Sequence, residues 1–345
     1  MRVVNRGIVG ALASLSLVAL VGCGADPGSG SADAAETEAP AAFPVTIDNC
    51  ARELEFDSPP ERVLTGYQNT VEIMIALGLE DRVVGRQPFD QSPLLPEQEE
   101  AFNAIPELVP GLPDDAQSVA ASREVQLAAQ PDFVLASGEF EVDASRGVAS
   151  IEDFQAAGAN VYILSSGHDS GGCSTSASTI DLLYADITNI GKIFGVEDRA
   201  EALIAQMRAE VADVQERVQG LDAPRMFAYD SGEGLLIAIS DRYFDFSLAG
   251  ADNVIDDPVQ GYPEVSQEVV ADADPEVIVT SNYNPGPLQE EAGAKEAYLR
   301  EALPNSAAVA DGRLVAIESI DLTPGVRNVR AIRQLAEAFH PEAFE

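Results

Sequence analysis

Residues 167–171, Gly-His-Asp-Ser-Gly, gather the three side-chain types of a hydrolytic relay. In that relay a carboxylate orients an imidazole, which takes the serine proton, and immediate neighbours along a chain cannot adopt this geometry. The stretch also lacks the G-x-S-x-G pattern of a nucleophile elbow between a strand and a helix. We therefore interpret it as a Gly/Ser-rich loop.

Metal and phosphate chemistry has little support from residue types. Two histidines are too few for a His-rich zinc or copper cluster, and P-loop, H-E-x-x-H and EF-hand patterns are absent. Three alternatives stay open: a bare metal held by Asp, Glu and Tyr oxygens, haem with His168 as an axial ligand, and a glycosidase using two of the 58 carboxylates. Since only residue type supports them, we expect no enzyme, no metal site and no cofactor.

Charge narrows the possible partners further. The 345 residues include 20 Lys and Arg against 58 Asp and Glu, a formal net charge of −38. Such a surface repels phosphate backbones, so nucleic acid is excluded as a partner. A hydrophobic content of 46% with 23% charged residues is typical of a globular protein, and the length fits two domains or one bilobal unit.

The N-terminal residues are typical of an export signal. Arg2 and Arg6 precede an apolar stretch at 7–22 that is too short and Gly/Ala-rich for a comfortable membrane span. It ends Leu-Val-Gly-Cys23, which resembles the bacterial lipobox, in which the cysteine is lipidated; an ordinary cleaved signal is the alternative. We predict a lipoprotein signal peptide at 1–22, a flexible acidic tether at 23–44, and an extracytoplasmic protein attached to the bacterial cell membrane through the lipid anchor only.

Export also bears on the other two cysteines. Cys50 and Cys173 form an even pair in an oxidising compartment, which favours a disulfide over two buried free thiols. In the chain-entropy description, closing so long a loop contributes about 4–5 kcal/mol. Neither cysteine has the C-x-x-C spacing of a redox or metal site.

A motif at 122–134 recurs at 266–278. Each copy predicts a capped short helix, a proline stop and a buried strand, at 133–137 and 277–281. Two similar α/β lobes follow from this repeat. The residues in register are Ser122, Glu124, Val125, Pro131, Asp132 and Val134 in the first copy, and Ser266, Glu268, Val269, Pro275, Glu276 and Ile278 in the second.

The remaining elements alternate in type, which indicates mostly parallel sheets. The segment 180–219 contains no proline, and its second half carries one apolar stripe, from Leu203 to Val218. It predicts a long, rigid helix between an N-terminal lobe at 45–176 and a C-terminal lobe at 221–345, with the connecting backbone at 177–220. Strands are expected at 63–65, 82–86, 161–165, 226–230, 235–239 and 314–317, and helices at 71–79 (opened by an Asn69–Glu72 capping box), 147–157 and 325–339.

This order of motifs resembles the substrate-binding lipoproteins of ABC importers for ferric siderophores and vitamin B12. The resemblance implies two Rossmann-like lobes on a helical backbone, as in class III periplasmic binding proteins. It departs from the family at 165–176, around Gly-Gly-Cys173. The matching stretches cover nearly all of 45–345 and are 62–85, 122–134, 186–203, 249–254, 262–268 and 311–317.

The resemblance also implies partners and site residues. Glu124 and Glu268 are expected to meet arginines on the two subunits of an ABC permease, whose ATPase supplies the energy, since charge pairs set docking register. A ferric siderophore is the expected cargo, with cobalamin, haem or another cofactor-like molecule as alternatives and a secreted hydrolase as the less favoured class. Because strand ends of α/β lobes face the crevice, and aromatics and arginines suit an organic chelate, we predict ligand contacts at Tyr67, Arg86, Tyr243, Tyr283 and Arg327.

Overall fold

The computed structural model describes residues 43–87, 93–110, 120–165, 179–255, 257, 260–282 and 293–345. Its first lobe contains a four-stranded, fully parallel sheet in the order β4-β3-β5-β6. The central strands β3 and β5 are buried throughout, because helices cover both faces of a parallel sheet. The four strands are β3 (Val63–Thr65), β4 (Val83–Arg86), β5 (Phe133–Ala136) and β6 (Asn160–Ile163).

Short helices follow these strands. The helix predicted at 147–157 begins only at its Ser150 cap, which forms a capping box with Asp153. They are α1 (Gln68–Ala76), η1 (Glu80–Arg82), α2 (Glu99–Ala104), α3 (Arg123–Ala128), η2 (Glu139–Val142), η3 (Ala144–Arg146) and α4 (Ile151–Ala156).

A hairpin that the sequence analysis did not predict precedes the first sheet. Strands β1 (Val45–Asn49) and β2 (Arg52–Phe56) pair antiparallel. Their connection puts Cys50 and Ala51 at φ of 51° and 59°, the left-handed conformation that a tight hairpin turn requires at both central residues. The Cys-Ala pair carries no turn signal, which explains the omission.

The second lobe has a mixed sheet in the order β10-β8-β7-β11-β12, with β9 beside β7. Strands β7, β9, β11 and β12 are parallel, whereas β8 and β10 add antiparallel pairs at one edge. The mostly parallel sheets predicted for both lobes are confirmed. The strands are β7 (Arg225–Ser231), β8 (Leu235–Ala238), β9 (Asp252–Asn253), β10 (Glu264–Ser266), β11 (Val277–Asn282) and β12 (Leu314–Glu318).

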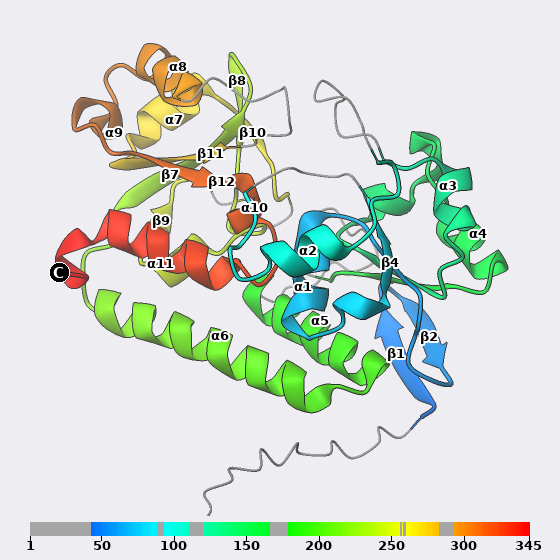
Figure 1. Ribbon diagram of the computed structural model, residues 1–345. Helices are drawn as coiled ribbons and strands as arrows, with labels where there is room; N and C mark the ends of the chain where they lie inside the picture. The colour runs from blue at the N-terminus through cyan, green and yellow to red at the C-terminus, as the bar shows by residue number, and fades with distance from the viewer. Residues whose placement is uncertain are drawn as a thin grey trace, which may run out of the picture. The chain divides into compact units, whose positions relative to one another are not determined.

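Helices surround this sheet as well. The helix α11 packs on α6 and on η4 (Figure 1), burying one apolar face that includes Ile332 and Leu335. The elements are η4 (Phe246–Ala249), α7 (Gln267–Ala273), α8 (Ala294–Ala302), α9 (Ala307–Ala310), α10 (Ser319–Leu322), α11 (Asn328–Phe339) and η6 (Pro341–Ala343).

Two helices, rather than one, connect the lobes. α5 (Thr179–Phe194) ends where Gly195 adopts a φ of 67°, and α6 (Glu197–Val218) then packs against α5. A Cβ on Gly191 would lie 2.6 Å from Ala200 Cβ, so glycine is what permits this close approach. The prediction of one long helix was wrong because the break depends on a single glycine within an otherwise helical pattern.

One apolar core nevertheless runs through both lobes and the connector. It includes Val63 of β3, Ile187 of α5, Val214 of α6 and Ala228 of β7. Two smaller clusters pack one on each sheet. Within the described ranges no helix is both long and apolar enough to span a bilayer.

Candidate functional site

Each lobe contributes a pair of aromatic side chains to one region of the molecule. In the first lobe Tyr67, at the start of α1, makes an edge-to-face contact with Phe140 at a centroid distance of 6.3 Å. In the second lobe the rings of Tyr243 and Tyr262 lie 4.7 Å apart, and their phenols are hydrogen-bonded. Tyr67 lies near enough to Tyr262 to affect its titration. We call these four residues the aromatic cluster.

Hydrogen bonds fix the phenols of Tyr243 and Tyr262. Tyr243 Oη donates to Thr323 Oγ1 at 3.1 Å, and Thr323 Oγ1 in turn donates to the carbonyl of Ser319 at 3.0 Å. Burial, then the neighbouring Tyr243 and Asp230, raise the pKa of Tyr262 well above its ordinary value. Rings with fixed polar tips suit a large organic ligand that needs both apolar contact and orientation.

A buried carboxyl group lies directly beneath Tyr67. Glu141, 2% exposed, accepts the backbone N–H of Ser137 at 3.0 Å and that of Tyr67. A Cβ on Gly66 would lie 1.2 Å from Glu141 Oε2, so only glycine leaves room for the carboxyl. Burial raises the pKa of Glu141 to about 8, although the two backbone hydrogen bonds oppose the rise. Glu141 thus ties together the ends of β3 and β5, and we call it the floor of the crevice.

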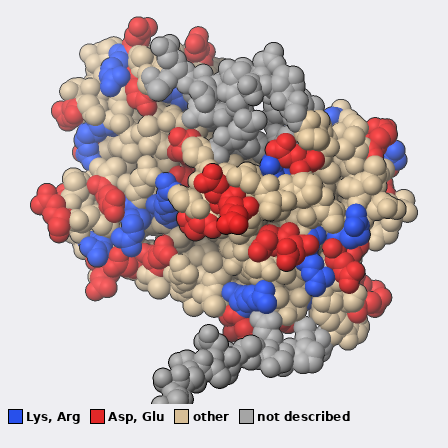
Figure 2. Space-filling model, viewed as in Figure 1, with Lys and Arg blue, Asp and Glu red and all other residues tan. Residues whose placement is uncertain are grey.

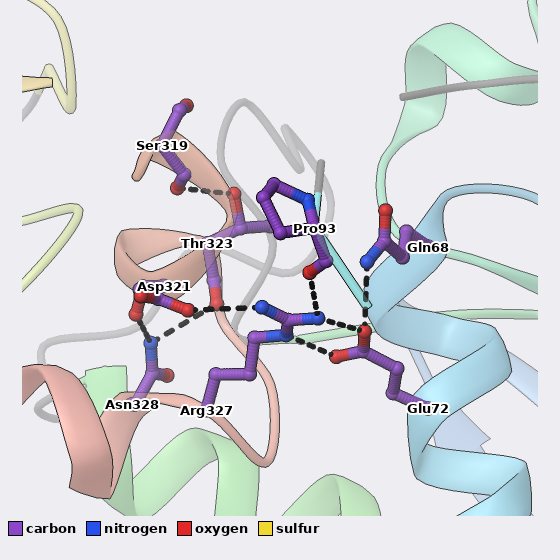
Figure 3. Close-up of polar contacts among 8 residues, drawn as sticks. All are labelled: Gln68, Glu72, Pro93, Ser319, Asp321, Thr323, Arg327 and Asn328. Atoms are coloured by element: carbon purple, nitrogen blue, oxygen red, sulfur yellow. Dashed lines mark hydrogen bonds and ion pairs between the residues drawn. The ribbon is translucent and has the colours of Figure 1, made fainter. Parts of the chain in front are cut away.

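A buried ion pair joins the two lobes (Figure 3). Arg327, just before α11, binds Glu72 of α1 with two hydrogen bonds, Nη2 to Oε1 at 2.7 Å and Nε to Oε2 at 2.8 Å. Its Nη1 donates to Asp321 Oδ1 at 3.2 Å, and its Nη2 also donates to the carbonyl of Pro93 at 2.8 Å. Bidentate pairs of this kind are directional and strong. We call Glu72, Asp321 and Arg327 the clamp.

The clamp is buried and supported by amides. Arg327 is 4% exposed and Glu72 1%, and Gln68 Nε2 donates to Glu72 Oε1 at 2.9 Å. Burial alone would lower the pKa of Arg327, but the hydrogen bonds and charges of Glu72, then Asp321, outweigh it and raise the pKa. A second link is made by Asn69 Nδ2, which donates to the carbonyl of Pro324 at 2.7 Å.

These contacts correct the expected roles of several residues. Asn69 and Glu72 do not form a capping box; α1 begins at Gln68 after Tyr67, and both side chains instead reach the other lobe. Arg327, predicted as a ligand contact, is part of the clamp, and its contact with a ligand stays a prediction, as does that of Arg86. Arg86, also predicted as a ligand contact, is held by Glu107 at 2.7 Å and stacks over Phe102 at 4.6 Å.

The other predicted site residues fall into two groups. Tyr67 and Tyr243 belong to the aromatic cluster, whose other members are Phe140 and Tyr262. Tyr283, Cys23 and Cys173 lie outside the described residues, as do the signal peptide and the loop around His168. Cys50 is disulfide-bonded, whereas its pairing with Cys173 stays a prediction. In the part of the chain described, no group of three or more His, Cys, Asp or Glu side chains is arranged to hold a metal ion.

Two of the arginines at the strand ends are paired with carboxylates. The undescribed segments between residues 43 and 345 contain no Lys or Arg, so every cation of this region lies in the described residues. At the strand ends, Arg86 and Arg327 are ion-paired and Arg242 also has a partner. Figure 2 shows acidic side chains gathered across the middle of the viewed face, with basic ones scattered among them. Of the cations in the described residues, Arg146 lies over a ring of the aromatic cluster, with its guanidinium 5.8 Å from the centre of the Phe140 ring.

A second cavity, away from the aromatic cluster, is too small to be the ligand site. It lies between α5, η4 and α11, is lined by residues such as Ile180, Phe244 and Ile332, and has a volume of about 10 Å³. Ligand pockets for cofactor-sized molecules are generally larger, at roughly 300–1,000 Å³.

The repeat forms the same structure in both lobes. Ser122 Oγ accepts the N–H of Val125 at 3.5 Å, and Ser266 Oγ accepts that of Val269 at 3.4 Å. The two glutamates occupy the second position of α3 and of α7, and both are exposed. The backbone N–H of Glu268 itself, then the Ser266 hydroxyl, lower the pKa of Glu268.

Comparison with known proteins identifies the class. Residues 63–334 match the family described as periplasmic binding protein, and the chain belongs to this family. An uncharacterized ABC transporter substrate-binding lipoprotein, YvrC of Bacillus subtilis, is 24% identical over 99% of both chains. A cobalamin-binding protein of Halobacterium salinarum is 27% identical over 89% of this chain and 77% of its own. 

A solved structure is also similar to this chain. The structure of an ABC-type Fe3+-hydroxamate transport system from Saccharomonospora viridis is 27% identical, with a TM-score of 0.68 over 86% of this chain and 99% of its own. The protein is thus an extracytoplasmic substrate-binding protein of the ABC-transporter type, with the two α/β lobes of class III periplasmic binding proteins. Its role implies a permease and an ATPase as partners.

Proposed function

We propose that the protein is the lipid-anchored receptor of an ABC importer that captures a ferric siderophore between its lobes and delivers it to the permease. The observation that carries the proposal is the aromatic cluster, to which both lobes contribute rings. Large, rigid rings contribute contact area to a chelate with an organic shell at low entropic cost. The likeness to the Fe3+-hydroxamate structure supports this cargo.

The charges of the protein favour an uncharged siderophore over an anionic one. Arg86 and Arg327 are neutralised by carboxylates, and the whole chain carries a net charge of −38. Moving an anionic ferric catecholate into such a field would be unfavourable. The proposed cargo is therefore an uncharged ferric tris-hydroxamate. Cobalamin is the second candidate, because the Halobacterium relative is a cobalamin-binding protein and the same charge argument admits a corrinoid.

Delivery and attachment complete the proposal. Cys23 carries the lipid, an assignment supported by the lipoprotein name of the Bacillus relative, and Cys50 pairs with Cys173. Glu124 and Glu268 dock on the permease dimer, one from each lobe. The domain limits of 45–176, 177–220 and 221–345 belong to the same proposal.

A ligand panel tests the cargo. Thermal unfolding and isothermal titration would use ferrichrome, its iron-free form, cyanocobalamin, haem, a ferric catecholate and free Fe³⁺. Ligand at a hundred times its dissociation constant adds about 2.7 kcal/mol to the free energy of unfolding, a shift of several degrees. We expect ferrichrome to shift the transition and its iron-free form to have no effect. A response to cyanocobalamin alone would replace the siderophore by the second candidate, and tight catecholate binding would contradict the charge argument.

Docking is tested separately from capture. The double substitution Glu124→Ala and Glu268→Ala should abolish import while the affinity for the bound chelate changes by less than about threefold, because neither residue contacts the aromatic cluster. Import at the wild-type rate would contradict the docking assignment and leave the cargo assignment intact.

A further inference from the structure

Residues 319–328 of the second lobe, which we call the junction segment, make hydrogen bonds to both lobes. Thr323 Oγ1 accepts one from Tyr243 Oη of the aromatic cluster at 3.1 Å. One residue later, the carbonyl of Pro324 accepts one from Nδ2 of Asn69, in the first lobe, at 2.7 Å. The junction segment therefore links a tyrosine of one aromatic pair to the helix α1, which begins directly after a tyrosine of the other pair.

Hydrogen bonds within the junction segment hold its two contacts together. Asn328 donates from Nδ2 to the carbonyls of Asp321 and Thr323, both at 3.0 Å (Figure 3). Its Oδ1 accepts the backbone N–H of Gly325 at 3.1 Å. The segment also approaches α1 closely, because a Cβ on Gly325 would lie 3.1 Å from that of Asn69. A displacement at the contact with Asn69 is therefore expected to move Thr323 as well. 

The amide nitrogen of Asn69 also reaches the support of the first aromatic pair. Its Nδ2 donates to Ser137 Oγ at 2.9 Å, and the backbone N–H of Ser137 donates to Glu141 Oε1 at 3.0 Å. Glu141 accepts the backbone N–H of Tyr67 as well. Asn69 is 1% exposed, and because a carbonyl can only accept, its amide must face Pro324 with the nitrogen. One buried side chain thus donates to a group in each lobe.

We propose that Asn69 is a positioning residue for ligand binding, which fixes the separation of the aromatic pairs Tyr67–Phe140 and Tyr243–Tyr262 before the ligand arrives. The inference deepens the proposed function and rests on it. Hydrogen bonds lead from the floor through Asn69 to the junction segment, and from there to Tyr243. Asn69 acts through these groups and does not itself contact the ligand. Rings that are already in place do not have to be ordered on binding, which increases affinity.

Fixing the rings in advance affects the binding rates in a defined way. Only molecules with both aromatic pairs in place accept the ligand, so the apparent dissociation constant rises in inverse proportion to the fraction of such molecules. Without the Asn69 link the first lobe is free to shift against the junction segment, and this fraction falls. Association then becomes slower, whereas dissociation of a ligand already held between the rings changes little.

The test compares Asn69→Ala with Asn49→Ala in the full chain, by isothermal titration and stopped-flow kinetics with ferrichrome and cyanocobalamin as probes. Asn49 is a matched control. It is 2% exposed, and its Nδ2 donates to the carbonyl of Ile163 at 2.7 Å, the same length as the bond from Asn69 to Pro324. Its hydrogen bond links β1 to β6 within the first lobe, so both variants lose a buried amide but only one loses a link between the lobes.

We expect Asn69→Ala to weaken binding of the probe that the wild type accepts by roughly 10-fold, the scale of one buried hydrogen bond. The loss should appear in the association rate, with the dissociation rate within about twofold of the wild type. Asn49→Ala should lower the midpoint of thermal unfolding and leave both rates unchanged. Thr323→Val interrupts the same path before Tyr243, so its effect combined with Asn69→Ala should be smaller than the product of the two single effects.

Wild-type affinity in Asn69→Ala, equal weakening by Asn49→Ala, or a loss confined to the dissociation rate would overturn the inference while probe binding by the wild type still upheld the proposed function. Binding of neither probe by the wild type would count against the proposed cargo. A measurement without ligand then decides the inference. Amide hydrogen exchange of Tyr67 and Ser137, whose N–H groups the floor accepts, should be roughly 10-fold faster in Asn69→Ala and unchanged in Asn49→Ala; unchanged exchange in Asn69→Ala would overturn it.

Discussion

Two buried glutamates differ in the groups that surround their carboxyl groups. Glu72 lies between the lobes, and Glu141 lies between two strand ends of the first lobe. Glu72 in the clamp is 1% exposed and makes a bidentate ion pair with Arg327. Glu141 in the floor is 2% exposed, accepts two backbone N–H groups, and its Oε2 has no hydrogen-bond partner within the described structure. Equal burial thus gives one carboxyl group paired with a cation and one without a cation, whose pKa is raised to about 8.

This difference separates two tasks. The clamp and the Asn69 link hold α1 of one lobe to the segment before α11 of the other, which limits lobe movement beyond what the paired connector helices impose. The floor instead positions Tyr67 from within one lobe. Breaking the clamp should therefore affect the whole fold, and altering the floor should affect a pH dependence.

The largest effect is expected from the clamp. Arg327→Met leaves Glu72 and Asp321 buried without their cation, which should lower the free energy of unfolding by about 3–5 kcal/mol. Urea unfolding of the variant and the wild type measures this change in the free energy of unfolding. Adding Glu72→Gln to Arg327→Met should recover part of the loss, because one uncompensated charge is removed. A loss below about 1 kcal/mol in the single variant would show that the pair contributes little to holding the lobes together.

A smaller, pH-dependent effect is expected from the floor. The pKa of Glu141 rises from 4.5 to about 8 on folding, so the folded state binds the extra proton between these values and stability falls as pH rises through this window. Glu141→Gln cannot ionise. The free energy of unfolding of Glu141→Gln should equal that of the wild type near pH 4. At pH 8 it should exceed the wild-type value by about 2–3 kcal/mol, after allowance for relaxation on ionisation.

Unfolding curves at several pH values for both proteins provide the measurement. A difference between them that stayed constant with pH would mean that the pKa of Glu141 is the same in the folded and unfolded states, and the comparison of the two glutamates would then fail.

Next in size is the contribution of the aromatic cluster to ligand binding. Tyr67→Ala removes the ring that meets Phe140 and should weaken binding of the cargo identified by the panel by roughly 10-fold, whereas Tyr67→Phe keeps the ring and should change it little. Isothermal titration compares the two. Equal losses would assign the contact to the phenol oxygen instead of the ring.

The smallest effect is expected at the surface. Arg123→Ala removes an exposed ion pair with Asp153, and such pairs contribute little to stability. The midpoint of thermal unfolding should not change measurably. A clear decrease would indicate that this ion pair is needed for α3 to form.

The sequence alone determined the local elements and the class. Serine caps, proline stops and β-branched strands predict their structures from neighbours a few residues away, so α3, α7, β5 and β11 form as the repeat indicates. The hairpin at Cys50 and the helix break at Gly195 were not predicted. Each depends on left-handed backbone conformations that the local sequence does not indicate.

Only the tertiary structure decided the roles of the charged residues between the lobes. Glu72 and Arg327 are 255 residues apart, and nothing near either one indicates the other. Arg86 and Arg327 have the residue type of ligand contacts, yet folding brings each beside a carboxylate that neutralises it. In the sequence nothing distinguishes Glu141 from the other Asp and Glu residues, 58 in all. Its special environment arises only when Gly66 and two strand ends enclose it in the fold. The charge and reach of a side chain are written in the sequence, whereas its partner and its dielectric surroundings exist only after distant segments have packed together.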